Sequence, residues 1–157
     1  MRKILTLTLL LLTLLSCSEK DIFIEGNIIP EPKKLKIKDN RLHQIKDVTI
    51  LSSSENLIYP HNKDEYYLSS KNGNVVIEGN VIWAKQTLKQ IADENNRIPD
   101  VEIHDWSAYP FRGFMHDTGR NFQTIEMLKE TIDLMSLYKI NYFHWHLTDN
   151  PAWRDRK

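Results

Sequence analysis

The sequence predicts an α+β fold in which a small mixed region is followed by a strand–helix–strand unit. Two runs rich in β-forming residues flank Asn72-Gly73, a pattern typical of a hairpin. Apolar residues recur at helical spacing in 81–96 and in 124–139, and the second segment lies between two apolar strand patterns. A chain of 157 residues is long enough for one ordinary domain, or for one small domain plus part of another.

The N-terminus has the layout of a secretory signal. Arg2 and Lys3 precede ILTLTLLLLTLL, a run of twelve residues that is apolar apart from three threonines and too short to span a bilayer. The following LLSC resembles the lipobox of bacterial lipoproteins, in which the signal is cut before a cysteine that is then acylated. We therefore expect a signal peptide at 1–16, lipid on Cys17 and a tether at 17–26. The resemblance implies an exported lipoprotein, anchored to a membrane in the periplasm or at the cell surface of a bacterium.

Composition excludes some classes of function. The chain is 41% hydrophobic and 27% charged, as in globular proteins, and its formal net charge is zero. It has no block of basic residues, which argues against a nucleic-acid surface. Because Cys17 is the only cysteine, no disulfide can form within the chain.

Residues 27–105 are predicted to form a small α+β domain. Prolines in IIPEPKKLKIK precede a strand, DVTIL is a β-branched strand, and DEYYLSSKNGNVVIEG is a hairpin. In 81–96 the i, i+4, i+7 spacing of an amphipathic helix is met by Ala84, Leu88 and Ile91. A further short strand lies in NRIPDVEIHDWSAYP. The region holds no convincing catalytic constellation, so its expected role is that of a scaffold.

Residues 106–157 are predicted to begin a parallel sheet. An extended run from Phe111 to His116 is followed by a helix, which Thr124 can cap and whose dipole favours Glu126 in its first turn. The apolar positions of this helix repeat at intervals of 3, 4 and 3: Ile125, Leu128, Ile132 and Met135. INYFHWHLTD is the next strand, and a strand–helix–strand order over so short a span implies parallel strands.

Polar side chains gather at the carboxyl end of both predicted strands. They are His116, Asp117 and Arg120 after the first, and Thr148, Asp149 and Asn150 after the second. In α/β folds ligands bind at this edge. Arg120 could grip neighbouring hydroxyls or a carboxylate, or form a surface ion pair. Asp149 could accept from Arg120, orient another acid or cap a loop, and Asp117 could pair with Arg112 or Arg120.

The HWH motif and the loop after it allow two other interpretations. His144 and His146 are two residues apart, so on a strand they face the same side and could hold zinc, although a site would need a further ligand. Buried, hydrogen-bonded histidines are the alternative. Trp153 lies beyond the strand and is the best candidate for a sugar platform among the tryptophans.

YPFRGFMHDTGRNFQTIEMLKETIDLMSLYKINYFHWHLTDNPAWR resembles the start of the catalytic barrel of family 20 glycoside hydrolases, the β-N-acetylhexosaminidases. The family pattern is roughly F-x-x-RG-x-x-x-D-x-x-R-H-F, a helix, and K-x-N-x-x-H-x-H-L-x-D-D-x-x-W-R. The matching residues are Arg112-Gly113, Asp117, Arg120, Phe122, Lys139, Asn141, His144, His146, Leu147, Asp149, Trp153 and Arg154. Asn121 and Asn150 depart from it, replacing a His and an Asp. Upstream segments are similar to the family's accessory domain, so the resemblance covers about 27–154.

The resemblance implies a fold and an activity. The fold is an α+β accessory domain at 27–105 followed by the first βαβ unit of an incomplete (β/α)8 TIM barrel at 106–157. The activity is hydrolysis of terminal β-linked N-acetylglucosamine or N-acetylgalactosamine from glycans. In this family the substrate's acetamide oxygen attacks the anomeric carbon, so the reaction retains configuration and differs from the usual two-carboxylate scheme.

The resemblance also implies roles for residues. Arg120 would bind sugar hydroxyls and Asp149 would support the site, with Asp117, His146 and Trp153 as possible further support. The family's Asp-Glu pair, which orients the acetamide and protonates the leaving group, is expected downstream. The only adjacent Asp-Glu pairs are Asp64-Glu65 and Asp93-Glu94, outside the motif. No cofactor or metal is implied; the partners would be N-acetylhexosamine glycans and, through Cys17, a membrane.

We therefore expect a truncated hexosaminidase that is inactive as an isolated chain. Two barrel strands cannot bury both their faces, so 106–157 should be only marginally ordered by itself, whereas 27–105 could be ordered. One alternative is a noncatalytic surface lipoprotein that binds sugar through Arg120 and Trp153. Another is a metal-dependent hydrolase that uses His144 and His146.

Overall fold

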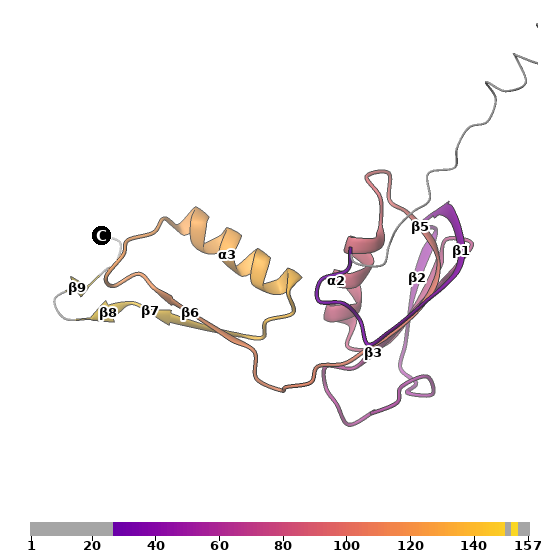
Figure 1. The fold of residues 1–157 in the computed structure, drawn as a ribbon, viewed down its shortest axis with the longest axis horizontal. Helices are drawn as coiled ribbons and strands as arrows, with labels where there is room; N and C mark the ends of the chain where they lie inside the picture. The colour runs from indigo at the N-terminus through magenta and orange to yellow at the C-terminus, as the bar shows by residue number, and fades with distance from the viewer. Residues whose placement is uncertain (1–26, 150–151, 154–157) are drawn as a thin grey trace, which may run out of the picture.

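The structure is a computed structural model that describes residues 27–149 and 152–153. Five strands form its N-terminal sheet: β1 (Lys34–Gln44), β2 (Asp47–Leu51), β3 (Tyr66–Lys71), β4 (Asn74–Gly79) and β5 (Arg97–Asp105). Their order is β1-β5-β3-β4-β2, in which β2 runs parallel to β4 and the other neighbours are antiparallel. Figure 1 shows the labelled strands of this sheet gathered in one part of the molecule. These strands and helix α2 (Val81–Ile91) are called the N-terminal sheet unit below. The predicted signal peptide, Cys17 and tether lie outside the described residues.

The predicted hairpin joins β3 to β4. Asn72 has φ 50° and Gly73 has φ 82°, the pair of positive values that a tight hairpin turn of the primed type requires. A Cβ atom at Gly73 would lie 2.0 Å from the backbone oxygen of Gln44. The glycine is therefore needed both for its backbone conformation and for the close approach of the chain after β1.

Helix α2 (Val81–Ile91) covers the sheet as its pattern predicts. Asn80 caps it by accepting a hydrogen bond from the Trp83 amide at 3.0 Å. Ala84, Leu88 and Ile91 are buried, in the same core cluster as Leu68, Val75, Ile77, Ile98, Val101 and Ile103. The helix ends before the polar tail of the predicted segment, because Asp93 accepts from the amides of Asn95 and Arg97 and turns the chain into β5.

The second unit, called the βαβ unit, consists of β6 (Gly113–Asp117), α3 (Ile125–Leu137) and β7 (Tyr142–His146). β6 and β7 pair in parallel, from Gly113 opposite Tyr142 to Asp117 opposite His146, which confirms the predicted arrangement. Thr124 caps α3 by accepting from the Met127 amide, and Glu126 lies in the first turn. The second predicted strand is broken at Leu147, after which β8 (Thr148–Asp149) pairs antiparallel with β9 (Ala152–Trp153).

The apolar face of α3 is buried only in part. Leu128 and Met135 are buried, whereas Ile125 is 38% and Ile132 is 46% exposed. The helix is thus correctly predicted, but the four apolar positions do not share one environment. The βαβ unit has a two-stranded sheet, which is too narrow to cover the whole apolar stripe of a helix.

Within the described residues, no helix combines the length and the apolar character needed to cross a membrane.

Candidate functional site

The carboxyl ends of β6 and β7 lie side by side and carry the polar cluster. Register places Asp117 opposite His146. The loop after β6 is held to β7 by the amides of Thr118 and Gly119, which donate to the His146 carbonyl at 3.0 and 3.3 Å. This loop delivers Arg120 beside the segment that begins β8.

Arg120 lies between two carboxylates. Its Nε donates to Asp117 Oδ2 and lies 3.3 Å from Asp149 Oδ2, while its backbone amide donates to Asp117 Oδ1 at 3.1 Å. The Arg120 side chain is 63% exposed. Within the described part of the chain, Nε makes both of these side-chain contacts with the carboxylates. We call Asp117, Arg120 and Asp149 the arginine cluster.

Charges in this cluster are set by the contacts. The Arg120 backbone amide, and then its guanidinium, hold the pKa of Asp117 below its ordinary value. Hydrogen bonding to Asp117 and the charges of both carboxylates raise the pKa of Arg120. At neutral pH the cluster therefore presents a fixed guanidinium backed by carboxylate, a geometry suited to neutral hydroxyl acceptors.

Arg112 decides between the two partners considered for Asp117. Its Nη1 lies 2.7 Å from Asp64 Oδ2, far from the carboxyl edge of the strands. Asp117 is thus the partner of Arg120. His116 does not join the cluster, and its ring lies near Phe114 and Phe143 with centroid separations of 5.9 and 6.5 Å.

Among the described residues, His144 and His146 are not joined by a third residue at metal-ligand spacing. The rings of His144 and His146 are 6.2 Å apart, as expected for one strand face. His146 Nε2 lies 3.5 Å from Asp149 Oδ2. Among the described residues, the group with metal-ligand spacing is Asp117, His146 and Asp149, which omits His144. The Arg120 side chain already contacts both carboxylates of that group, so a cation would compete with the guanidinium.

The remaining predicted residues are placed only in part. The Trp153 backbone pairs with Thr148 in the β8–β9 ladder, which brings that chain segment next to Asp149. Asn150 and Arg154 lie outside the described residues.

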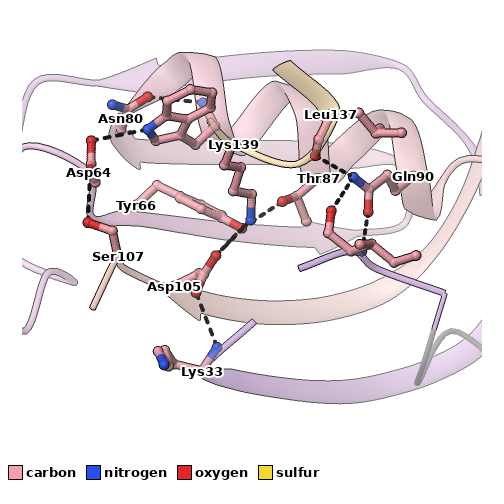
Figure 2. Close-up of polar contacts among 12 residues, drawn as sticks. Lys33, Asp64, Tyr66, Asn80, Thr87, Gln90, Asp105, Ser107, Leu137 and Lys139 are labelled. Atoms are coloured by element: carbon pink, nitrogen blue, oxygen red, sulfur yellow. Dashed lines mark hydrogen bonds and ion pairs between the residues drawn. The ribbon is translucent and has the colours of Figure 1, made fainter. Parts of the chain in front are cut away.

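A buried polar cluster elsewhere was not predicted from the sequence. Lys139 is 7% exposed, and its Nζ lies 2.7 Å from Asp105 Oδ2 and 3.0 Å from the Tyr66 hydroxyl (Figure 2). Lys139 matches the family pattern, but nothing in the residues pointed to a partner. The available signal was its position, a lysine in the short link between an amphipathic helix and an apolar strand.

Comparisons with known proteins agree with the motif. Residues 109–156 match the model of glycosyl hydrolase family 20, catalytic domain. The β-hexosaminidase of Porphyromonas gingivalis is 30% identical over 92% of this chain and 26% of its own length. The chitooligosaccharidolytic β-N-acetylglucosaminidase of Bombyx mori is 39% identical over 57% of this chain and 17% of its own length.

Solved structures give the same result. A β-N-acetylhexosaminidase from Bacteroides fragilis superposes with a TM-score of 0.68 at 25% identity, over 82% of this chain and 35% of that one. An exo-β-N-acetylglucosaminidase from Vibrio harveyi, solved in complex with N-acetylglucosamine, gives 0.67 at 26% identity, over 82% of this chain and 26% of that one.

The parallel strand pair and the arginine cluster at its carboxyl edge lie in the part of the chain that is similar to glycoside hydrolases. Residues 109–156 resemble the catalytic domain of glycoside hydrolase family 20, which confirms the resemblance identified from the sequence. The chain spans only about a quarter of the length of the Porphyromonas relative and less of the Bombyx one.

Proposed function

We propose that this chain is part of a β-N-acetylhexosaminidase, which removes terminal β-linked N-acetylglucosamine or N-acetylgalactosamine from glycans. The family match and the names of the relatives support this activity. In the same proposal, 106–157 supply the first βαβ unit of a (β/α)8 barrel and 27–105 an accessory domain. The parallel β6–β7 pair linked through α3 supports that assignment.

The observation that carries the proposal is the arginine cluster at the carboxyl edge of β6 and β7. Asp117 and Asp149 fix the guanidinium through Nε, so its Nη groups can donate in parallel to adjacent sugar hydroxyls. Asp149 supports the site by contacting Arg120 at 3.3 Å and His146 at 3.5 Å. These residues bind and orient a sugar; they do not protonate a leaving group.

Bond cleavage needs two further groups. In the proposed reaction the acetamide oxygen of the substrate attacks the anomeric carbon, one acid protonates the departing oxygen and a second carboxylate orients the acetamide. Residues 109–157 contain no adjacent Asp-Glu pair. A polypeptide limited to the 157 residues is therefore expected to bind N-acetylglucosamine without hydrolysing its glycosides.

Sugar titration tests the binding role. Residues 17–157 would be titrated with N-acetylglucosamine by NMR, and Arg120→Ala should weaken binding by about tenfold or more, since a charge-assisted hydrogen bond is lost. Arg97→Ala is the matched control, because Arg97 is also an exposed arginine paired with an aspartate. Equal binding by Arg120→Ala and the wild type would contradict the assignment.

A chromogenic N-acetylglucosaminide assay on the same polypeptide tests the chemical role. No turnover is expected. Turnover, with other hexosaminidases excluded, would show that the chain itself contains a proton donor and would overturn the division of roles. A noncatalytic sugar-binding lipoprotein would also show binding without turnover. Joining the chain to further residues separates the two functions, because restored turnover would indicate the hydrolase.

We also propose that the protein is exported and anchored through lipid on Cys17. The basic, apolar and LLSC segments of residues 1–17 support this. Metabolic labelling with a fatty acid in a bacterial host should mark the wild type but not Cys17→Ala. Labelling of both, or of neither, would count against lipid on this cysteine.

A further inference from the structure

Lys139 anchors the start of β7 in the N-terminal sheet unit. It follows α3 in a left-handed conformation, with φ 57°, and its Nζ enters the unit beside Asp105 and the ring of Tyr66 (Figure 2). The Tyr66 hydroxyl lies 2.6 Å from Thr87 Oγ1 and donates to Asp105 at 3.2 Å. Burial raises the pKa of Tyr66, which keeps the hydroxyl neutral. The buried ammonium thus has a carboxylate partner and a hydroxyl partner.

Arg112 anchors the start of β6 in the same way. It immediately precedes Gly113, and its Nη1 lies 2.7 Å from Asp64 Oδ2. Asp64 also accepts from Ser107 Oγ at 2.6 Å and from Trp83 Nε1 at 3.2 Å. The Asp64 and Arg112 side chains are 16% and 21% exposed, so this pair is largely protected from water.

The two anchors are joined to one another. Arg112 Nε donates to the Lys139 carbonyl at 2.8 Å, and the Arg112 carbonyl accepts from the amides of Asn141 and Tyr142 at 3.0 and 3.2 Å. The starts of β6 and β7 are therefore bonded to each other as well as to the sheet unit.

The end of α3 adds two contacts at the boundary between the N-terminal sheet unit and the βαβ unit, which is called the seam below. Gln86 of α2 donates to Ser136 Oγ at 2.6 Å, and Gln90 donates to the Leu137 carbonyl at 3.2 Å. Contacts between the units thus come from both strand starts and from the helix end, whereas the arginine cluster lies at the opposite end of the strands.

We propose that Asp64 and Asp105 act as paired anchors which fix the positions of β6 and β7 and so hold the arginine cluster in its geometry, with Arg112 and Lys139 as positioning residues. Each strand is five residues long, so about 15 Å of parallel ladder separates its start from its carboxyl end. A shift in one strand start is transmitted along this ladder, because the register is continuous from Gly113–Tyr142 to Asp117–His146. The role in sugar binding rests on the proposed function; the anchoring does not.

Hydrogen exchange and arginine NMR on residues 17–157 test this directly. Lys139→Met leaves Asp105 without its cation, so amide exchange in β6 and β7 should accelerate by about tenfold or more. The β3–β4 hairpin should keep its protection. The Arg120 Nε–H signal, a direct report on its contact with Asp117, should shift or broaden, and Lys139→Arg should restore it.

Glu102→Gln is the control, because Glu102 is on β5 and pairs with Lys38 at an exposed surface, where the carboxylate side chain is 41% exposed. It should leave both readouts unchanged. An unchanged Arg120 Nε–H signal in Lys139→Met would overturn the proposal. So would equal loss of protection in β3–β4, because Lys139 would then stabilise the whole molecule without positioning the strands. Absence of sugar binding by the wild type would count against the proposed function alone.

Discussion

The two units of the molecule have equally clear local sequence patterns, but they differ in how much apolar surface they bury. The hydrophobic core cluster of the described residues lies wholly in the N-terminal sheet unit and the segment before it. In the βαβ unit, Leu128 and Met135 are the buried apolar residues, while Met115, Ile132, Leu134, Tyr142 and Trp145 are each more than 40% exposed. Clear strand and helix patterns in the sequence therefore produce strands and helices whether or not these elements enclose a hydrophobic core.

The difference lies in the number of layers and strands. In the N-terminal sheet unit, five strands and α2 enclose one core, and buried residues alternate with less buried ones along most of β3. In the βαβ unit, two strands and one helix leave apolar side chains exposed, and its buried charges point toward the sheet unit. The smaller unit thus depends on the larger one for position, although its own hydrogen bonds define its local shape.

The strongest test of this comparison removes the larger unit. A peptide of residues 106–157 should show no cooperative unfolding transition, because two strands and a helix bury too little apolar surface to offset the entropy of ordering. Residues 17–157 should show one. Circular dichroism during heating and urea titration measures both. A sigmoidal transition in the isolated peptide would show that the βαβ unit folds without its neighbour.

The next test compares one apolar truncation in each unit. Leu68→Ala removes a fully buried side chain of β3 and should lower the free energy of unfolding by about 2–5 kcal/mol. Ile132→Ala, at a position 46% exposed, should cost about 1 kcal/mol or less. Urea unfolding of the two variants of residues 17–157 measures the difference. Similar costs would mean that Ile132 is covered in solution.

Elements determined by neighbours in sequence were predictable. Asn72-Gly73 gives its turn because both residues tolerate positive φ, and Thr124 gives the start of α3 because its side chain reaches an amide three residues on. The Arg120–Asp117 pair is also local, at a separation of three residues, but the sequence left Arg112 open as the partner of Asp117. In the turn and the helix cap, the geometry is fixed within one turn of chain.

Features that depend on distant partners could not be predicted. Lys139 is buried because Asp105, 34 positions away, meets it across the seam, and Arg112 finds Asp64 at a separation of 48. The order β1-β5-β3-β4-β2 likewise depends on which edges meet in space. The exposed positions Ile125 and Ile132 were unpredictable for the same reason, since periodicity reports an apolar stripe and not what covers it.

The smallest expected effect is a change in stability at low pH, and it again distinguishes the two units. Burial alone would raise the pKa of Asp64, but hydrogen bonds from Ser107, Arg112 and Trp83 outweigh it and hold the pKa below its ordinary value. A carboxylate with a lowered pKa in the folded state contributes stability that is complete above its unfolded pKa of about 3.9. That contribution is lost as the pH falls through the lower pKa that Asp64 has in the folded state. Arg112 is the charged group in contact with Asp64, and Asp105 and Lys139 line the same seam.

Asp64→Asn should therefore be less stable than the wild type at pH 6, and the difference should shrink below about pH 4. Urea unfolding of residues 17–157 at a series of pH values measures it. Asp93→Asn is the matched control within the sheet unit, since Asp93 also has a lowered pKa but pairs with Arg97 across a local turn. Its stability should change with pH while the Arg120 Nε–H signal stays constant, whereas Asp64→Asn should alter that signal at pH 6. If the two variants change the Arg120 Nε–H signal to the same extent, the contacts at the seam do not specifically position the βαβ unit.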